Sequence, residues 1–153
     1  MQENSYIQVL IQSLHQKVEA LDSIIEKNKE QYEILSAEEA DMDAFEKNID
    51  EKSQYIDKIV FLDDGFEEIY TRVKEELDGN RAAYTEEIQK MKDLISMITE
   101  RSMKIQVQEQ RNKELAGMQF SKARKKIRQV KAGNKAATQY LSLIHISEPT
   151  RQA

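Results

Sequence analysis

The fold is decided by the stretch from Tyr6 to Leu35, which reads YIQVLIQSLHQKVEALDSIIEKNKEQYEIL. Its apolar residues recur at alternating steps of four and three, the repeat of a helix that buries one stripe against other helices. The spacing predicts a helix about 45 Å long. The one polar member of this repeat, Asn28, either fixes the register or the number of partner helices, or marks the point where the packing stripe ends. The repeat consists of Ile7, Ile11, Leu14, Val18, Leu21, Ile25, Asn28, Tyr32 and Leu35.

A second repeat with the same spacing predicts a helix from Asp43 to Leu77. Two patterns of capping-box form, Ser36 with Glu39 and Asp43 with Glu46, predict a short connection before it. Gly65 in its middle costs about 1 kcal/mol relative to Ala, and we expect a kink there rather than a full turn, because the repeat continues in phase. The repeat consists of Phe45, Ile49, Lys52, Ile56, Ile59, Asp63, Phe66, Tyr70, Val73 and Leu77.

A third repeat follows the turn-forming residues Asp78-Gly79-Asn80, where we expect the second chain reversal. It stops at residues 108–114, which contain no apolar residue. A helix that starts near Arg81 needs only about 30 to 35 residues to run the length of its neighbours, so it should leave them near Leu115. The predicted fold is therefore all-α, an antiparallel bundle of three long helices with an overhanging C-terminal amphipathic helix. The third repeat consists of Tyr84, Ile88, Met91, Ile95, Ile98 and Ile105.

Composition excludes most kinds of chemistry. The 153 residues include no Cys and only two His, His15 and His145, and the four Gly form no phosphate-binding motif. We therefore expect no catalysis, no cofactor and no metal. The N-terminus lacks the pattern of a signal peptide, and no apolar run is long enough to span a membrane. A cytoplasmic protein without membrane insertion is expected.

The charge is unevenly distributed. Residues 1–121 hold 15 Lys and Arg against 27 Asp and Glu, a net charge of −12, whereas residues 122–140 hold seven basic residues and no acid. The basic residues surround apolar ones at helical spacing, which predicts an amphipathic helix with no partner left in the chain. We expect this helix to capture an amphipathic partner helix, with basic residues steering an acidic partner. The predicted contacts are Met103, Leu115, Met118, Phe120, Ile127 and Val130, with Arg124, Lys125 and Arg128 beside them.

The last residues differ from everything before them. The string from Leu141 to Arg151 contains the only Pro and matches the translation of a transposase adapter used in preparing sequencing libraries. We expect residues 1–140 to form a single helical domain and residues 141–153 to be a non-native tail. A natural tail is the alternative.

Three segments carry a pattern that spacing alone does not explain: Leu62 to Leu77, with Phe66 and Tyr70, then Ile105 to Lys113, then Lys125 to Gln129. In these segments the chain resembles the FlgN/FliT-type flagellar export chaperones. The resemblance implies a small helical protein without catalytic activity. Such a protein binds the C-terminal helix of a late flagellar substrate, a hook-associated or filament-cap protein, and delivers it to the export gate. It also implies that a tyrosine on the C-terminal helix contacts the gate, and Tyr140 is the candidate.

Two other hypotheses about function remain open. The repeats also suit a structural coiled-coil protein that oligomerises, whereas a chaperone with a closed bundle should be a monomer or a dimer. The basic helix could bind nucleic acid, but its only interleaved aromatic residue is Phe120 and the rest of the chain is acidic. We therefore favour a protein partner and expect no nucleic acid.

Overall fold

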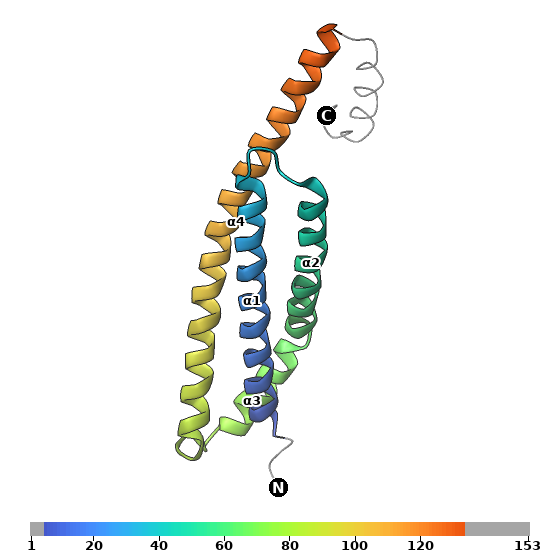
Figure 1. Ribbon diagram of the computed structural model, residues 1–153. Coiled ribbons are helices and arrows are strands. Elements are labelled where there is room, and N and C mark those ends of the chain that lie inside the picture. Colours follow the sequence, from blue (N-terminus) through green and yellow to red (C-terminus); the bar gives the residue numbers. More distant parts are fainter. Residues whose placement is uncertain (1–4, 134–153) are drawn as a thin grey trace. The chain divides into compact units, whose positions relative to one another are not determined.

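The computed structural model describes residues 5–133, with side chains as far as Val130, and this part of the chain is almost entirely helical (Figure 1). Four α-helices follow one another: α1 Tyr6–Ser36, α2 Met42–Asp64, α3 Phe66–Leu77 and α4 Thr85–Gly133, with the short 3₁₀ helix η1 Arg81–Tyr84 before α4. No strand occurs among the described residues, so the all-α prediction is confirmed. The chain divides into two units, one ending at Asn112 and the other beginning at Lys113.

Helix α1 supplies most of the core of the first unit. It begins after Ser5, whose side-chain oxygen accepts a hydrogen bond from the Gln8 backbone N–H at 3.3 Å. Of the predicted repeat only Tyr32 is not buried, being 38% exposed, and Gln31 is buried instead. The Tyr32 ring lies 3.9 Å from the Arg111 guanidinium, a contact that keeps it at the surface.

The partners of α1 run in opposite directions. Ion pairs of 2.8 Å join Lys17 to Asp63 and Lys27 to Glu51, so α1 and α2 are antiparallel. A 3.0 Å bond joins Arg101 to Asp22, and the polar contacts between residues 28 and 108 follow in the same order, so the first part of α4 runs parallel to α1. Figure 1 shows α2 and this part of α4 on either side of α1.

An apolar cluster closes the end of the unit where α1 begins. Residues from three helices meet there, and the Ile7 backbone N–H also donates to a Glu76 carboxylate oxygen at 3.0 Å. Burial of a side chain of this size contributes about 1.5–3 kcal/mol, so the cluster is the main source of stability at this end. Its buried members are Ile7, Leu10, Ile11, Leu14 and Val18 from α1, Val73 and Leu77 from α3, and Met91 and Leu94 from α4.

The helix expected from Asp43 to Leu77 is divided in two at Gly65, the residue at which the sequence predicts a kink. The chain leaves helical geometry at Gly65, with φ −96° and ψ 3°, and α3 starts at the next residue. The start of α2 also differs, because Asp41 is the cap and its carboxylate accepts from the Ala44 N–H at 3.1 Å. The described residues thus form four helices where three were expected.

The inward face of α2 was predicted only in part, because Phe45, Lys52 and Ile59 of the repeat are half-buried whereas Ile49 and Ile56 are not. Ile49 and Ile56 are 41% and 42% exposed, and the only buried residue of this helix is Asn48. The side chain of Asn48 bonds to α1, so the side of α2 that carries Asn48 faces inward, and Ile49 and Ile56 remain exposed. Apolar spacing therefore identified the helix but only part of the face that it buries.

The second reversal is where the sequence places it. Helix α3 ends at Leu77, and Gly79 has a φ of +76°, a conformation that glycine adopts without steric cost. Helix α4 then runs unbroken past Leu115 to Gly133. That the part of α4 beyond Leu115 extends past the other helices remains a prediction. Tyr140 and the tail from Leu141 lie outside the described residues. None of the described helices is long and apolar enough to cross a membrane.

Candidate helix-binding surfaces and a buried amide layer

The predicted partner-binding stripe lies largely in the second unit. Phe120 and Val130 are 44% and 53% exposed, and Ile127 is half-buried. At 3.6 residues per turn these three residues share one side of α4, with Arg124 at its edge. The same geometry places the exposed Met118, together with Lys125, on the far side, and the half-buried Leu115 and the exposed Arg128 between the two sides. The helix thus brings together only part of the predicted set.

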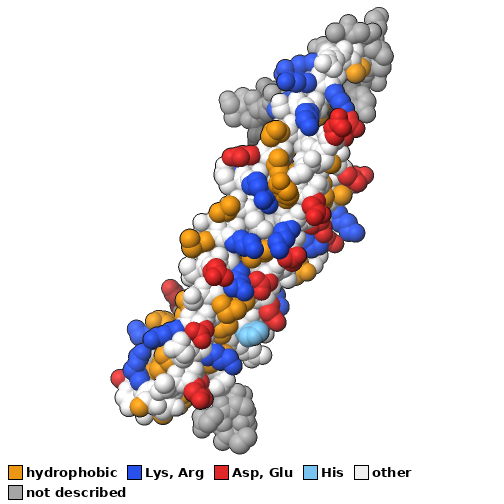
Figure 2. All heavy atoms as spheres, turned by 60° about the vertical axis from the view of Figure 1, so that its left-hand side comes forward, with side chains coloured by type: hydrophobic (Ala, Val, Ile, Leu, Met, Phe, Trp, Pro, Cys, Tyr) orange, Lys and Arg blue, Asp and Glu red, His pale blue; other side chains and the backbone are white. Residues whose placement is uncertain are grey.

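Met103 belongs to the first unit. It is 62% exposed on α4, near Val107 at 71% and Ile95 at 50%. Figure 2 shows a face on which hydrophobic side chains reach the surface among side chains of both charges. Exposed methionine suits a surface that adapts to its partner.

A groove between α1, α3 and the start of α4 was not predicted as a site. Its volume is about 1140 Å³. The rings of Phe66 and Tyr70 stack beside it, with centroids 5.7 Å apart and planes 13° from parallel. Its charged rim carries no net charge, with three basic and three acidic residues. The signal available in the sequence was the Phe66 and Tyr70 pair that carries the family resemblance. The apolar lining comprises Leu10, Leu14, Phe66, Tyr70, Val73, Leu77, Ile88, Met91 and Ile95.

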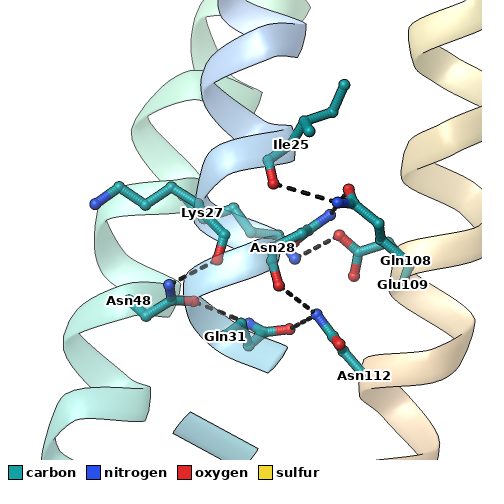
Figure 3. A network of polar contacts seen from close by, with 9 residues as sticks. Ile25, Lys27, Asn28, Gln31, Asn48, Gln108, Glu109 and Asn112 are labelled. Atoms are coloured by element: carbon teal, nitrogen blue, oxygen red, sulfur yellow. Dashed lines mark hydrogen bonds and ion pairs between the residues drawn. The ribbon is translucent and has the colours of Figure 1, made fainter. Parts of the chain in front are cut away.

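A layer of five buried side-chain amides crosses the first unit farther along α1 (Figure 3). Asn28 and Gln31 of α1, Asn48 of α2, and Gln108 and Asn112 of α4 are at most 6% exposed. We call these five residues the amide layer. It joins three helices through side-chain hydrogen bonds, where the sequence suggested that the packing stripe fades.

Hydrogen bonds link the layer from α2 to α4. Asn48 donates to the Lys27 backbone oxygen at 2.9 Å and accepts from Gln31 at 3.0 Å. Asn112 donates to Gln31 at 3.1 Å and to the Asn28 backbone oxygen at 3.0 Å. Gln108 accepts from Asn28 at 3.2 Å and donates to the Ile25 backbone oxygen at 3.3 Å.

The sequence carries a signal for this layer, which the pattern of apolar residues alone does not show. Gln108 and Asn112 follow Ile105 at steps of three and four, so they continue the packing repeat with amides in place of apolar residues. Two acceptors, the Oδ1 atoms of Asn28 and Asn112, are buried without a hydrogen-bond partner. The layer is therefore polar and incompletely paired.

Ion pairs flank the amide layer. Lys52 of α2 pairs with Glu109 of α4, and Lys27 pairs with Glu51. The hydrogen bond between Lys27 and Glu51 lowers the pKa of the Glu51 carboxyl and raises the pKa of the Lys27 ammonium. Among the described residues, no group of three or more His, Asp and Glu side chains is placed to hold a metal ion.

The described chain is thus a coiled-coil-like helical protein that leaves apolar side chains at its surface. A family model described as FlgN protein matches residues 1–142. The chain therefore belongs to the FlgN family, the flagellar export chaperones, and the resemblance is confirmed. Proteins of this family are chaperones rather than enzymes and bind flagellar export substrates. No curated protein and no solved structure matches the chain.

Proposed function

We propose that this chain is a cytosolic chaperone that binds the C-terminal helix of a late flagellar substrate, a hook-associated or filament-cap protein, and delivers it to the export gate. Membership of the FlgN family supports the chaperone role. The observation that carries the choice of surface is the exposure of Phe120 and Val130 on one side of α4. Large apolar side chains left in water favour association with a partner.

The contacts would form on α4. Phe120, Ile127 and Val130 would pack against the apolar side of the substrate helix, and Met103, Leu115 and Met118 would extend the contact. Arg124, Lys125 and Arg128 would attract an acidic substrate and raise its association rate at low salt more than its final affinity. Tyr140 would contact the export gate.

A double substitution tests the surface. Phe120→Asp with Ile127→Asp should abolish capture of purified hook-associated and filament-cap proteins encoded in the same flagellar gene cluster. The melting temperature should change little, because both residues lie outside the unit that holds the apolar cluster. Val9→Asp, at a residue 39% exposed on α1 and outside the proposed contacts, is the matched control and should bind normally.

Two results would count against the proposal. Undiminished capture by the double variant would move the binding surface elsewhere, and a large loss of stability would mean that the two side chains support the protein's own core. Size-exclusion chromatography with light scattering should give a monomer or a dimer. An extended assembly would favour the structural coiled-coil alternative.

A further inference from the structure

The outer side of α2 carries a line of exposed apolar residues. Met42, Ile49 and Ile56 are 41–42% exposed, and Val60 is 62% exposed. Residues seven apart on a helix lie within about 20° of each other, and Val60 follows Ile56 by one turn. These four residues therefore form one continuous stripe about 27 Å long. We call it the α2 stripe.

Acidic residues border this stripe on one side. Glu46, Asp50, Asp57 and Asp64 are all exposed, and helical geometry turns them about 40° to 80° from Met42. On the other side the single basic residue, Lys52, is paired with Glu109 of α4. The stripe is thus apolar with an uncompensated acidic edge, the complement of a helix whose apolar side is bordered by Lys and Arg.

We propose that the α2 stripe is a second helix-docking surface, and that its occupant is an amphipathic helix of another protein whose apolar side has basic edges. The proposal goes beyond the proposed function, which places an acidic partner on the basic side of α4. Apolar contact with the isoleucines supplies affinity, and the acidic edge selects the sign of the partner's charge. Phe61, which is 78% exposed beyond the acidic edge, offers a ring to a Lys or Arg of the partner.

A second copy of α2 does not fit this surface. In an antiparallel pair of α2 helices the two acidic edges would face each other, and like charges across an interface disfavour association. In a parallel pair each acidic edge would face a side whose single basic residue, Lys52, is already paired with Glu109. The surface therefore discriminates against its own copy and favours a helix of opposite charge.

Two designed peptides test the proposal on the full chain. Each has about five turns of helix with Leu at steps of four and three, and one carries Lys and the other Glu at the flanking positions. Fluorescence anisotropy should show the Lys peptide binding about tenfold tighter than the Glu peptide, and losing affinity as salt is raised. Equal affinity for both peptides would overturn the proposal.

Variants of α2 then locate the binding. Ile49→Asp with Ile56→Asp should weaken the Lys peptide by about tenfold or more. Asp50→Lys with Asp57→Lys, at exposed positions that leave the apolar residues in place, should reverse the preference toward the Glu peptide. Reversing Glu19 and Glu26 on α1, which are also exposed, makes the same change in net charge and should leave the preference unaltered. Circular dichroism checks that each variant is folded.

The remaining outcomes separate this proposal from others. The Phe120→Asp, Ile127→Asp variant should bind the Lys peptide normally. The proposal for α4 and the proposal for α2 are therefore tested independently. If the Lys peptide binds the Phe120→Asp, Ile127→Asp variant but not the parent chain, the chain's own α4 covers the α2 stripe and the proposal is wrong. If the Asp50→Lys, Asp57→Lys variant instead changes the oligomeric state, the occupant is a second copy and the proposal is also wrong.

Discussion

A buried carboxamide stabilises a helix interface only when its N–H groups and its oxygen find partners, since each unpaired group loses its hydration without compensation. In the amide layer Asn112 uses its nitrogen twice, toward Asn28 and Gln31, while its own oxygen stays unpaired. Gln31 depends on Asn112 for the hydrogen bond to its oxygen. The layer therefore depends strongly on each member.

Replacing Asn112 by Ala tests this dependence. The change leaves the buried Gln31 oxygen without that donor, and we expect the free energy of unfolding to fall by about 1–3 kcal/mol. Urea denaturation followed by circular dichroism measures it. Gln106→Ala, at an exposed position of the same helix, should change it by less than about 0.5 kcal/mol. Equal effects from both would mean that the layer contributes nothing specific.

The pair of Lys27 and Glu51 makes stability depend on pH. Folding lowers the pKa of Glu51, so its contribution is present above the carboxyl's unfolded pKa and is lost as the pH falls through the lowered value. Folding raises the pKa of Lys27, so its contribution is lost only in alkali. Glu51→Gln should therefore be less stable than the parent chain near neutrality, and the difference should shrink below about pH 4. A difference in urea midpoint that stays constant with pH would contradict this cause. Glu46→Gln is the exposed control.

Single elements differ in how far the sequence determines them. Helix α1 could be predicted to within one residue, because most of its apolar residues follow one unbroken repeat and Ser5 caps it. Helix α2 has apolar residues on two sides, so spacing alone could not tell that Asn48 lies inside and Ile49 outside. The parts of the amide layer on α2 and α4 could not be predicted from apolar spacing either, because a polar residue at a packing position looks like the end of the apolar stripe. Of the predicted α4 stripe, helical geometry unites Phe120, Ile127 and Val130 but not Met118.

Two glycines test the connections between elements. Gly65 has a negative φ, and a Cβ added there would meet nothing within 4 Å, so Gly65→Ala should stabilise the chain by about 0.4–1 kcal/mol. Gly79 has a φ of +76°, so Gly79→Ala should destabilise it by about 1–2 kcal/mol. Thermal unfolding of the two variants compares them. A loss of stability in Gly65→Ala would show that the break between α2 and α3 needs more freedom than its φ suggests.

At the scale of the whole molecule, charge follows the division into units. Residues 1–112 hold 14 basic and 26 acidic residues, a net charge of −12, and residues 113–153 hold 9 and 2, a net charge of +7. An overall charge of −5 therefore conceals two regions of opposite sign. Each region can attract a different partner at low salt.

The non-native tail is a prediction about the gene rather than the fold. The family match ends at residue 142, close to the expected boundary at Leu141. Resequencing the parent gene should replace everything from about Leu141 onward with a different segment. Recovery of the same codons from genomic DNA amplified without library adapters would establish a natural tail.

The amide layer also predicts where the first unit should open most readily. A hydrogen bond contributes a net of about 0.5–1.5 kcal/mol, less than a buried Leu or Ile side chain. Transient opening should therefore start near Asn28 and Gln31, while the end around Ile7 and Leu14 stays closed. Peptide N–H groups near the layer would exchange with deuterated solvent first. A partner that must insert between the helices would therefore enter beside the connection from α1 to α2. The apolar cluster at the opposite end would keep the helices associated during this insertion.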